Sequence, residues 1–137
     1  MTADREKLSE IHAKGFNCAQ VVASMCHELS GIDEQSALAA MGGFGGGLRC
    51  GEVCGAVSGA VFTLGLCCPY NEDNKDTKTK ITELTKECTA AFKEKFGTLS
   101  CRELLAANGK TACENYMAYA IELTHEIIER ENENGNL

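Results

Sequence analysis

Apolar side chains recur at helical spacing along most of the chain. Cys18, Val22, Met25 and Leu29 repeat at intervals of three or four residues, which places them on one face of a helix spanning residues 18–29. Comparable stripes predict further helices over residues 3–14, 34–41, 77–96 and 112–130, with a short turn at 101–106. No segment shows the sustained alternation that is typical of strands. The pattern therefore predicts an all-α fold.

The most apolar stretch lies near the middle of the chain. Residues 53–68 carry no charge and are almost wholly apolar or small. As a helix they would reach about 24 Å, short of the roughly 30 Å hydrocarbon layer of a membrane. We therefore expect no membrane span but a buried central helix over 51–66, surrounded by the other helices in a single-domain bundle of residues 1–137. The tail 131–137 is expected to fray.

Glycines are concentrated next to and within this central helix. The run 42–47 is too rich in glycine for a regular element, and its backbone N–H groups could approach a cluster or a cysteine sulfur. Gly55 and Gly59 lie four residues apart in the helix, where they allow another helix to approach closely or a cofactor to bind. The candidate cofactor-binding glycines are Gly45, Gly46, Gly47, Gly55 and Gly59. A helix with a glycine face also makes a homo-oligomer possible.

Composition narrows the class of protein. The 137 residues include nine cysteines, and 20 acidic against 13 basic residues give a formal net charge of -7, the wrong sign for binding nucleic acid. Residues 1–7 are charged and contain no apolar segment of a signal peptide. An odd number of cysteines would leave one unpaired in a disulfide framework. We therefore expect a protein of the reducing cytoplasm, whose cysteines serve a metal or redox chemistry.

The spacing of the cysteines excludes several kinds of site. They stand at positions 18, 26, 50, 54, 67, 68, 88, 101 and 113, and no pair forms Cys-x-x-Cys. This spacing excludes thioredoxin-type active sites, zinc ribbons, ferredoxin runs and haem attachment. Any shared centre must therefore be assembled from distant segments.

Four cysteines are predicted to lie in the first turn of four different helices: Cys18, Cys54, Cys101 and Cys113. Capping residues support three of these positions, namely Asn17, Ser100 and Thr111. Free N–H groups and the positive end of the helix dipole stabilise a thiolate and lower its pKa. Helix N-termini also suit anionic clusters. The four cysteines are therefore predicted to share one functional site.

The remaining cysteines have other expected roles. Cys26 and Cys88 lie on apolar helix faces and are expected to be buried packing residues. Cys67 and Cys68 lie near a helix end. Cys50 is a possible fifth metal ligand, because within a helix it would point almost parallel to the cysteine four residues later, a geometry that suits two ligands better than a disulfide.

Charged side chains near these cysteines give weaker signals. Arg49 and Arg102 are each close in sequence to a cysteine and could stabilise a thiolate or balance the charge of a cluster; a solvated position is the alternative. His12, His27 and His125 are expected to be surface or capping residues, and none of them is assigned to the site.

Several motifs carry a resemblance to a known family. They are GFNCAQ at 15–20, FGGG at 44–47, CGAVSGA at 54–60, FG at 96–97 and CREL at 101–104. The chain resembles the C_GCAxxG_C_C family of redox-active proteins over most of its length and in the expected order. The family cysteines correspond to Cys18, Cys54, Cys101 and Cys113. A similar domain accompanies haem segments in split-Soret cytochromes and implies an iron–sulfur centre. This chain has no haem motif, so the resemblance implies the cluster alone.

Three hypotheses follow for the chemistry of this set. In the first, the four cysteines bind an iron–sulfur cluster, favoured as [2Fe-2S], for electron transfer or redox sensing with a partner protein. In the second, the protein is a dithiol/disulfide oxidoreductase in which Cys101 attacks and Cys113 or Cys18 resolves. In the third, zinc bound to the same residues stabilises a non-catalytic helical bundle that binds a partner protein.

Overall fold

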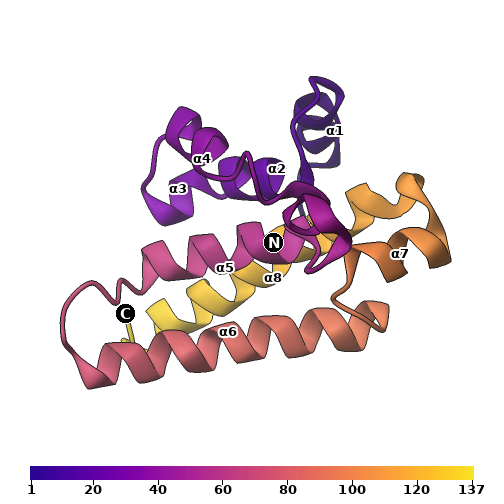
Figure 1. Ribbon diagram of the computed structural model, residues 1–137. Helices are drawn as coiled ribbons and strands as arrows, with labels where there is room; N and C mark the ends of the chain where they lie inside the picture. Colours follow the sequence, from indigo (N-terminus) through magenta and orange to yellow (C-terminus); the bar gives the residue numbers. More distant parts are fainter.

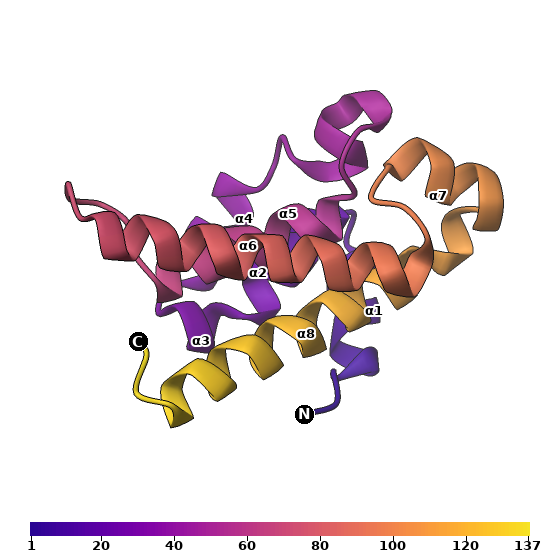
Figure 2. The same cartoon turned by 90° about the horizontal axis from the view of Figure 1, so that it is seen from below.

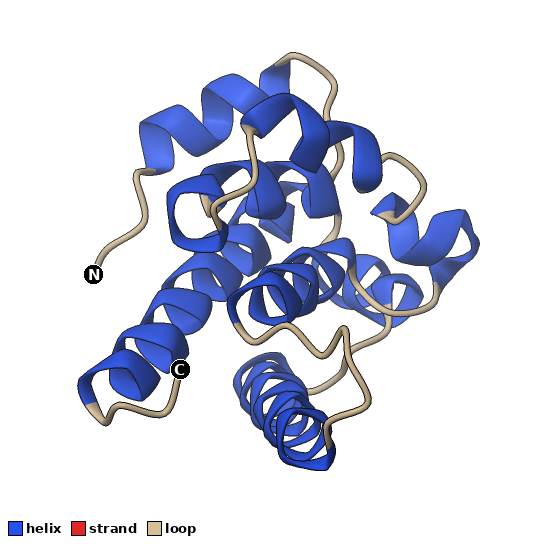
Figure 3. Ribbon diagram, turned by 90° about the vertical axis from the view of Figure 1, so that its left-hand side faces the viewer, coloured by secondary structure: helices blue, strands red, loops and turns tan.

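The computed structural model describes residues 1–137 and confirms the all-α prediction, with helices joined by loops and no strands (Figure 3). The α-helices are α1 (Arg5–Ala13), α2 (Cys18–Met25), α3 (His27–Ser30), α4 (Glu34–Ala40), α5 (Gly55–Cys67), α6 (Lys75–Phe96), α7 (Cys101–Asn108) and α8 (Cys113–Glu133). Two shorter turns are η1 (Gly47–Gly51) and η2 (Lys110–Ala112).

Helix α5 occupies the centre of the bundle, as its uncharged sequence predicts. It packs against α2 on one side and against α6 and α8 on the other (Figures 1 and 2). Its apolar side chains point in all directions around the helix, so burial is favourable on every side that a neighbour covers. None of the helices combines the length and apolar character that crossing a membrane requires.

Gly59 explains how closely α2 and α5 approach. A Cβ atom added at Gly59 would lie 2.8 Å from the carbonyl oxygen of Ala19 and 2.9 Å from Cβ of Val22. Helix packing therefore accounts for this glycine. The face that the sequence suggested could attract a second subunit is covered by α2 of the same chain.

Several boundaries differ from the sequence prediction. The central helix, expected over 51–66, begins only at Gly55. The helix expected over 18–29 breaks at Cys26, whose φ of -96° and ψ of 13° leave the α region; the periodicity continues because α3 resumes against the same core. The turn expected at 101–106 is a full helix, α7, which extends to Asn108. Helix α6 begins at Lys75, because the side chain of Asn74 accepts a hydrogen bond from the N–H of Thr77 and caps it there.

The prediction that residues 131–137 fray is wrong for their first part. Helix α8 continues to Glu133, and Glu131 is buried. Its carboxylate accepts hydrogen bonds from Lys80 Nζ of α6 at 2.9 Å and from Asn136 Nδ2 at 3.2 Å. This ion pair joins residues far apart in the sequence and fixes the end of α8. No local sequence pattern predicts it.

Candidate functional site

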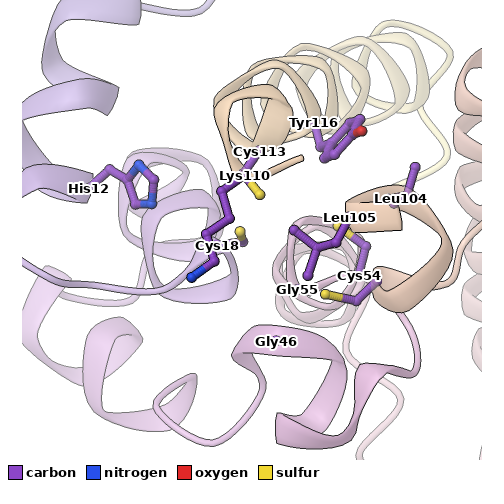
Figure 4. Close-up of a pocket in the computed structure, with 11 residues that line it drawn as sticks. His12, Cys18, Gly46, Cys54, Gly55, Leu104, Leu105, Lys110, Cys113 and Tyr116 are labelled. Atoms are coloured by element: carbon purple, nitrogen blue, oxygen red, sulfur yellow. The ribbon is translucent and has the colours of Figure 1, made fainter. Parts of the chain in front are cut away.

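The four helix-start cysteines line one pocket of about 230 Å³. Figure 4 shows the sulfur atoms of Cys18 and Cys113 close together, with Cys54 across the pocket. The other lining residues are His12, Gly46, Gly55, Leu104, Leu105, Lys110 and Tyr116. Because the cysteines come from four different helices, only the tertiary fold brings them to a common space.

The first residue of α2 is Cys18, and a capping box fixes this position. The side chain of Asn17 accepts a hydrogen bond from the N–H of Gln20, while the Gln20 side chain accepts one from the N–H of Asn17. The Asn17 amide also donates to the carbonyl oxygen of Gly42 at 3.1 Å. Gly45 lies so close to Asn17 that an added Cβ would overlap its side chain. The cap therefore fastens the glycine-rich segment to the start of α2.

A short backbone bridge brings Cys54 and Cys101 to the same side of the molecule. Val53 and Ser100 form an isolated antiparallel bridge. The N–H of Cys54 donates to the carbonyl of Leu99 at 2.7 Å, and the N–H of Cys101 donates to that of Glu52 at 2.6 Å. These bonds join the starts of α5 and α7. Cys54 is the N-cap residue of α5, and Cys101 is the first residue of α7.

Cys113 is the first residue of α8, and its thiol interacts directly with that of Cys18. The hydrogen bond from Cys18 lowers the pKa of Cys113 to about 6, and the positive charges of His12 and Lys110 act in the same direction. The same hydrogen bond, together with burial, raises the pKa of Cys18. The pair therefore releases a first proton readily and retains the second, with the negative charge on Cys113.

The expectation that helix N-termini lower the pKa of all four thiols is wrong for three of them. Burial raises the pKa of Cys54 to about 11, although the N–H groups of Ala56 and Val57 donate to its sulfur and act in the opposite direction. Burial, followed by the neighbouring Cys113, raises the pKa of Cys101. Desolvation and mutual repulsion between like charges outweigh the helix ends here. All four thiols can ionise together only if positive charge enters the pocket.

The glycines suggested for cofactor binding fall into two groups. Gly46 and Gly55 line the pocket. The other three make contacts outside it: Gly45 lies against Asn17, Gly47 against the backbone of Glu52, and Gly59 against α2. The segment is irregular, as predicted: Gly46 and Gly47 adopt positive φ, and so do Leu48 and Arg49 in the turn η1 (Gly47–Gly51) that continues it.

Cys50 and the two arginines hold this segment but do not line the pocket. Cys50 is exposed, and its thiol donates to the carbonyl of Gly47 at 3.4 Å. Arg49 donates to the carbonyl of Gly42, and Arg102 donates to that of Cys50, each at 2.7 Å. Arg49 therefore binds the glycine-rich run 42–47, and Arg102 binds the turn η1 that follows it.

The positive side chains of the pocket are instead His12 and Lys110. The sequence suggested a surface or capping role for His12 and did not consider Lys110 for this site. Lys110 stands three residues before Cys113, and this proximity was the one available signal. Nothing in the pattern of α1 indicates that His12 lies near Cys113, because the two residues meet only through the packing of α1 on α8.

The remaining cysteines lie outside the pocket. Cys26 and Cys88 are buried in the core, as predicted, and burial raises the pKa of each to about 12. Cys67 is partly buried, and its thiol donates to the carbonyl of Leu29 at 3.4 Å. Cys68 is buried beside it.

In this arrangement no three His, Cys, Asp or Glu side chains converge closely enough to hold one metal ion. The pocket still supplies four thiols as possible ligands, and no carboxylate lines it. Thiolates are the ligands that iron–sulfur clusters use most. The donor set therefore suits such a cluster, provided that the thiols turn towards a common centre.

Comparison with known proteins gives one match. The model of a family described as "Putative redox-active protein (C_GCAxxG_C_C)" matches residues 16–127. This range includes all four pocket cysteines. No curated protein and no solved structure matches the chain.

Proposed function

The chain belongs to this family of redox-active proteins, and we propose that its four pocket cysteines bind an iron–sulfur cluster, favoured as [2Fe-2S], for electron transfer or redox sensing. The observation that carries the proposal is that Cys18, Cys54, Cys101 and Cys113 line one pocket although they come from four helices. Such a cluster, when bound, takes up and releases single electrons.

The electrostatics of the pocket support this choice. Cys18, Cys54 and Cys101 resist ionisation because they are buried and lie near other thiols. Iron ions would supply the positive charge that stabilises four thiolates together. The N–H groups that already point at the sulfur of Cys54 would remain as donors to a ligating thiolate. Binding would require Cys18 and Cys113 to give up their mutual hydrogen bond.

The apolar part of the pocket supports a redox centre in a second way. Leu104 and Tyr116 are buried, and Leu105 lies beside them at the pocket wall. Side chains of this kind restrict the access of water, and solvent exposure is one of the factors that set the potential of a cluster. On the opposite side, Lys110 and His12 offset negative charge.

Anaerobic preparation tests the proposal. Protein isolated without oxygen, or reconstituted with iron and sulfide, should contain both elements and show visible absorption that serine substitutions at Cys18, Cys54, Cys101 or Cys113 weaken. Cys67→Ser is the matched control outside the pocket, and Cys50→Ser tests the suggested fifth ligand. Reconstituted protein without iron, sulfide or a visible band would refute the proposal. Metal analysis that finds one zinc ion per chain would instead support the zinc hypothesis.

A dithiol mechanism is the second candidate, favoured by the contact between Cys18 and Cys113. In this mechanism the Cys113 thiolate attacks a substrate disulfide and releases one thiolate. The Cys18 thiolate, formed by loss of its proton to solvent, then attacks the mixed disulfide. This step releases the second thiolate and leaves a Cys18–Cys113 disulfide. The lowered pKa favours Cys113 as the nucleophile in place of Cys101, whose pKa is raised.

Counting thiols separates these two candidates. In a titration of metal-free protein with oxidised dithiothreitol, the dithiol mechanism requires the loss of two free thiols, at Cys18 and Cys113. Unchanged thiol counts across the titration would remove it. For either chemistry, we propose a reducing cytoplasmic setting and a redox partner protein, in keeping with free cysteines.

A further inference from the structure

A hydrogen-bonded chain connects α1 to the first turn of α8 beside the pocket. The hydroxyl of Ser9 donates to Oε1 of Glu114, and Nδ1 of His12 lies 2.8 Å from Oε2 of the same carboxylate. Glu114 immediately follows Cys113 in the chain, and His12 itself lines the pocket. The three side chains therefore hold an imidazole at the edge of the four-cysteine site.

The carboxylate determines which nitrogen of His12 remains available. Hydrogen bonds from Ser9 and then from His12 lower the pKa of Glu114, so its carboxyl group is ionised at neutral pH and can only accept. Nδ1 must therefore carry a proton, and Nε2 is the nitrogen that can gain or lose one. This arrangement matches the way in which proteins orient functional histidines through a carboxylate.

We propose that His12 is a functional residue of the four-cysteine site: held by Glu114, its imidazolium places a positive charge near Cys113 and favours the more negative, reduced state of the site. The inference rests on the proposed cluster. A one-electron donor, dithionite in the assay, supplies the electron.

The surroundings of His12 give this charge its effect on Cys113. The charged and titratable groups around the imidazole are Glu114 and Cys113 of α8, Cys18 of α2, Lys110 of η2 and Arg5 of α1. The imidazole is only partly exposed, at 34%, so solvent screens its charge incompletely. Lys110 contributes a second positive charge near Cys113.

His12→Asn with His125→Asn as control tests the proposal. His125 also pairs with a glutamate, Glu129, at 3.5 Å, but it does not line the pocket. The reduction potential of cluster-loaded protein is measured with dithionite at pH 6 and pH 8, on either side of the usual histidine range. At pH 6, His12→Asn should disfavour reduction about tenfold, which is about 59 mV for one electron. The difference from the wild type should be smaller at pH 8, and His125→Asn should match the wild type at both values.

A second measurement keeps this inference separate from the proposed cluster. In reduced, metal-free protein, alkylation of Cys113 at pH 6 should be slower in His12→Asn than in His125→Asn, because the thiolate loses a nearby positive charge. If no preparation binds a cluster, the proposed function fails while alkylation still tests the charge of His12. Equal potentials in loaded His12→Asn and His125→Asn would overturn the inference. If His12→Asn does not fold, Glu114→Gln removes the orienting carboxylate, and an unchanged pH dependence in that variant would also overturn it.

Discussion

Replacing Gly59 by alanine tests the close packing that positions the start of α2. The new Cβ would lie 2.8 Å from the carbonyl oxygen of Ala19 and 2.9 Å from Cβ of Val22, whereas carbon contacts are ordinarily about 3.5–4.0 Å. The helices must therefore separate by roughly 0.5–1 Å, because one of the contacts is backbone and cannot rotate away. Overpacking of this kind costs about 1–3 kcal/mol, and the higher helix propensity of alanine offsets about 1 kcal/mol of it.

Gly65→Ala is the matched control in the same helix, since nothing lies within 4 Å of an added Cβ there. Both variants gain helix propensity, so the difference between their free energies of unfolding isolates the packing cost, expected to be about 2 kcal/mol. For 137 residues, an unfolding entropy of about 2.1 cal/mol/K per residue converts this difference to about 7 °C in Tm. Calorimetry measures it directly. A Gly59→Ala protein that melts at or above Gly65→Ala would refute the close packing of α2 on α5.

Three further predictions concern the thiols, the end of α8 and the core. Because the pKa of Cys113 is lowered to about 6, the rate of its alkylation in metal-free protein should reach half of its plateau near pH 6. Mass spectrometry of the modified peptides measures this rate. A midpoint near the ordinary pKa of a thiol would contradict the prediction. Lys80 lowers the pKa of Glu131, so their ion pair stabilises the fold above the ordinary glutamate pKa and is lost as the pH falls through the lowered value. Lys80→Met should therefore be less stable than the wild type at neutral pH and equally stable in acid, as measured by urea unfolding. An equal loss of stability at neutral and at acid pH would argue against the ion pair. Phe92 is fully buried among aromatic rings, and Phe92→Ala should cost about 3–5 kcal/mol by the same measurement, whereas a loss below about 1 kcal/mol would contradict its central place in the core.

Local signals in the sequence were sufficient to predict most of the helices. Periodic apolar positions predict α2, α6 and α8, and capping residues mark where helices begin, because both features act within a few residues of the chain. Asn17 and Ser100 do cap the helices that start with Cys18 and Cys101. For the same reason, the position of these cysteines at helix starts could be predicted before any tertiary contact was known. The prediction for Thr111 is wrong, because the N-cap residue of α8 is Ala112 and no side chain caps this helix.

The ionisation of the site could not be predicted in this way. A helix start lowers the pKa of a thiol only while other influences are small, and in the folded chain burial raises the pKa of Cys54 and Cys101. Cys113 alone has a lowered pKa, because Cys18 donates to it and His12 and Lys110 lie near it. Each of these influences depends on distances between separate helices.

The sequence by itself determined the helical class, the buried central helix and the set of cysteines at helix starts, because periodicity, capping and glycine placement act locally. Only the tertiary structure decided that these cysteines share a pocket, since the bridge between Val53 and Ser100 and the packing of α2 on α5 join segments far apart in the chain. It also decided that His12 is a pocket residue and that Glu131 fixes the end of α8. The physical reason is that burial and charge–charge distances arise only when distant segments pack together.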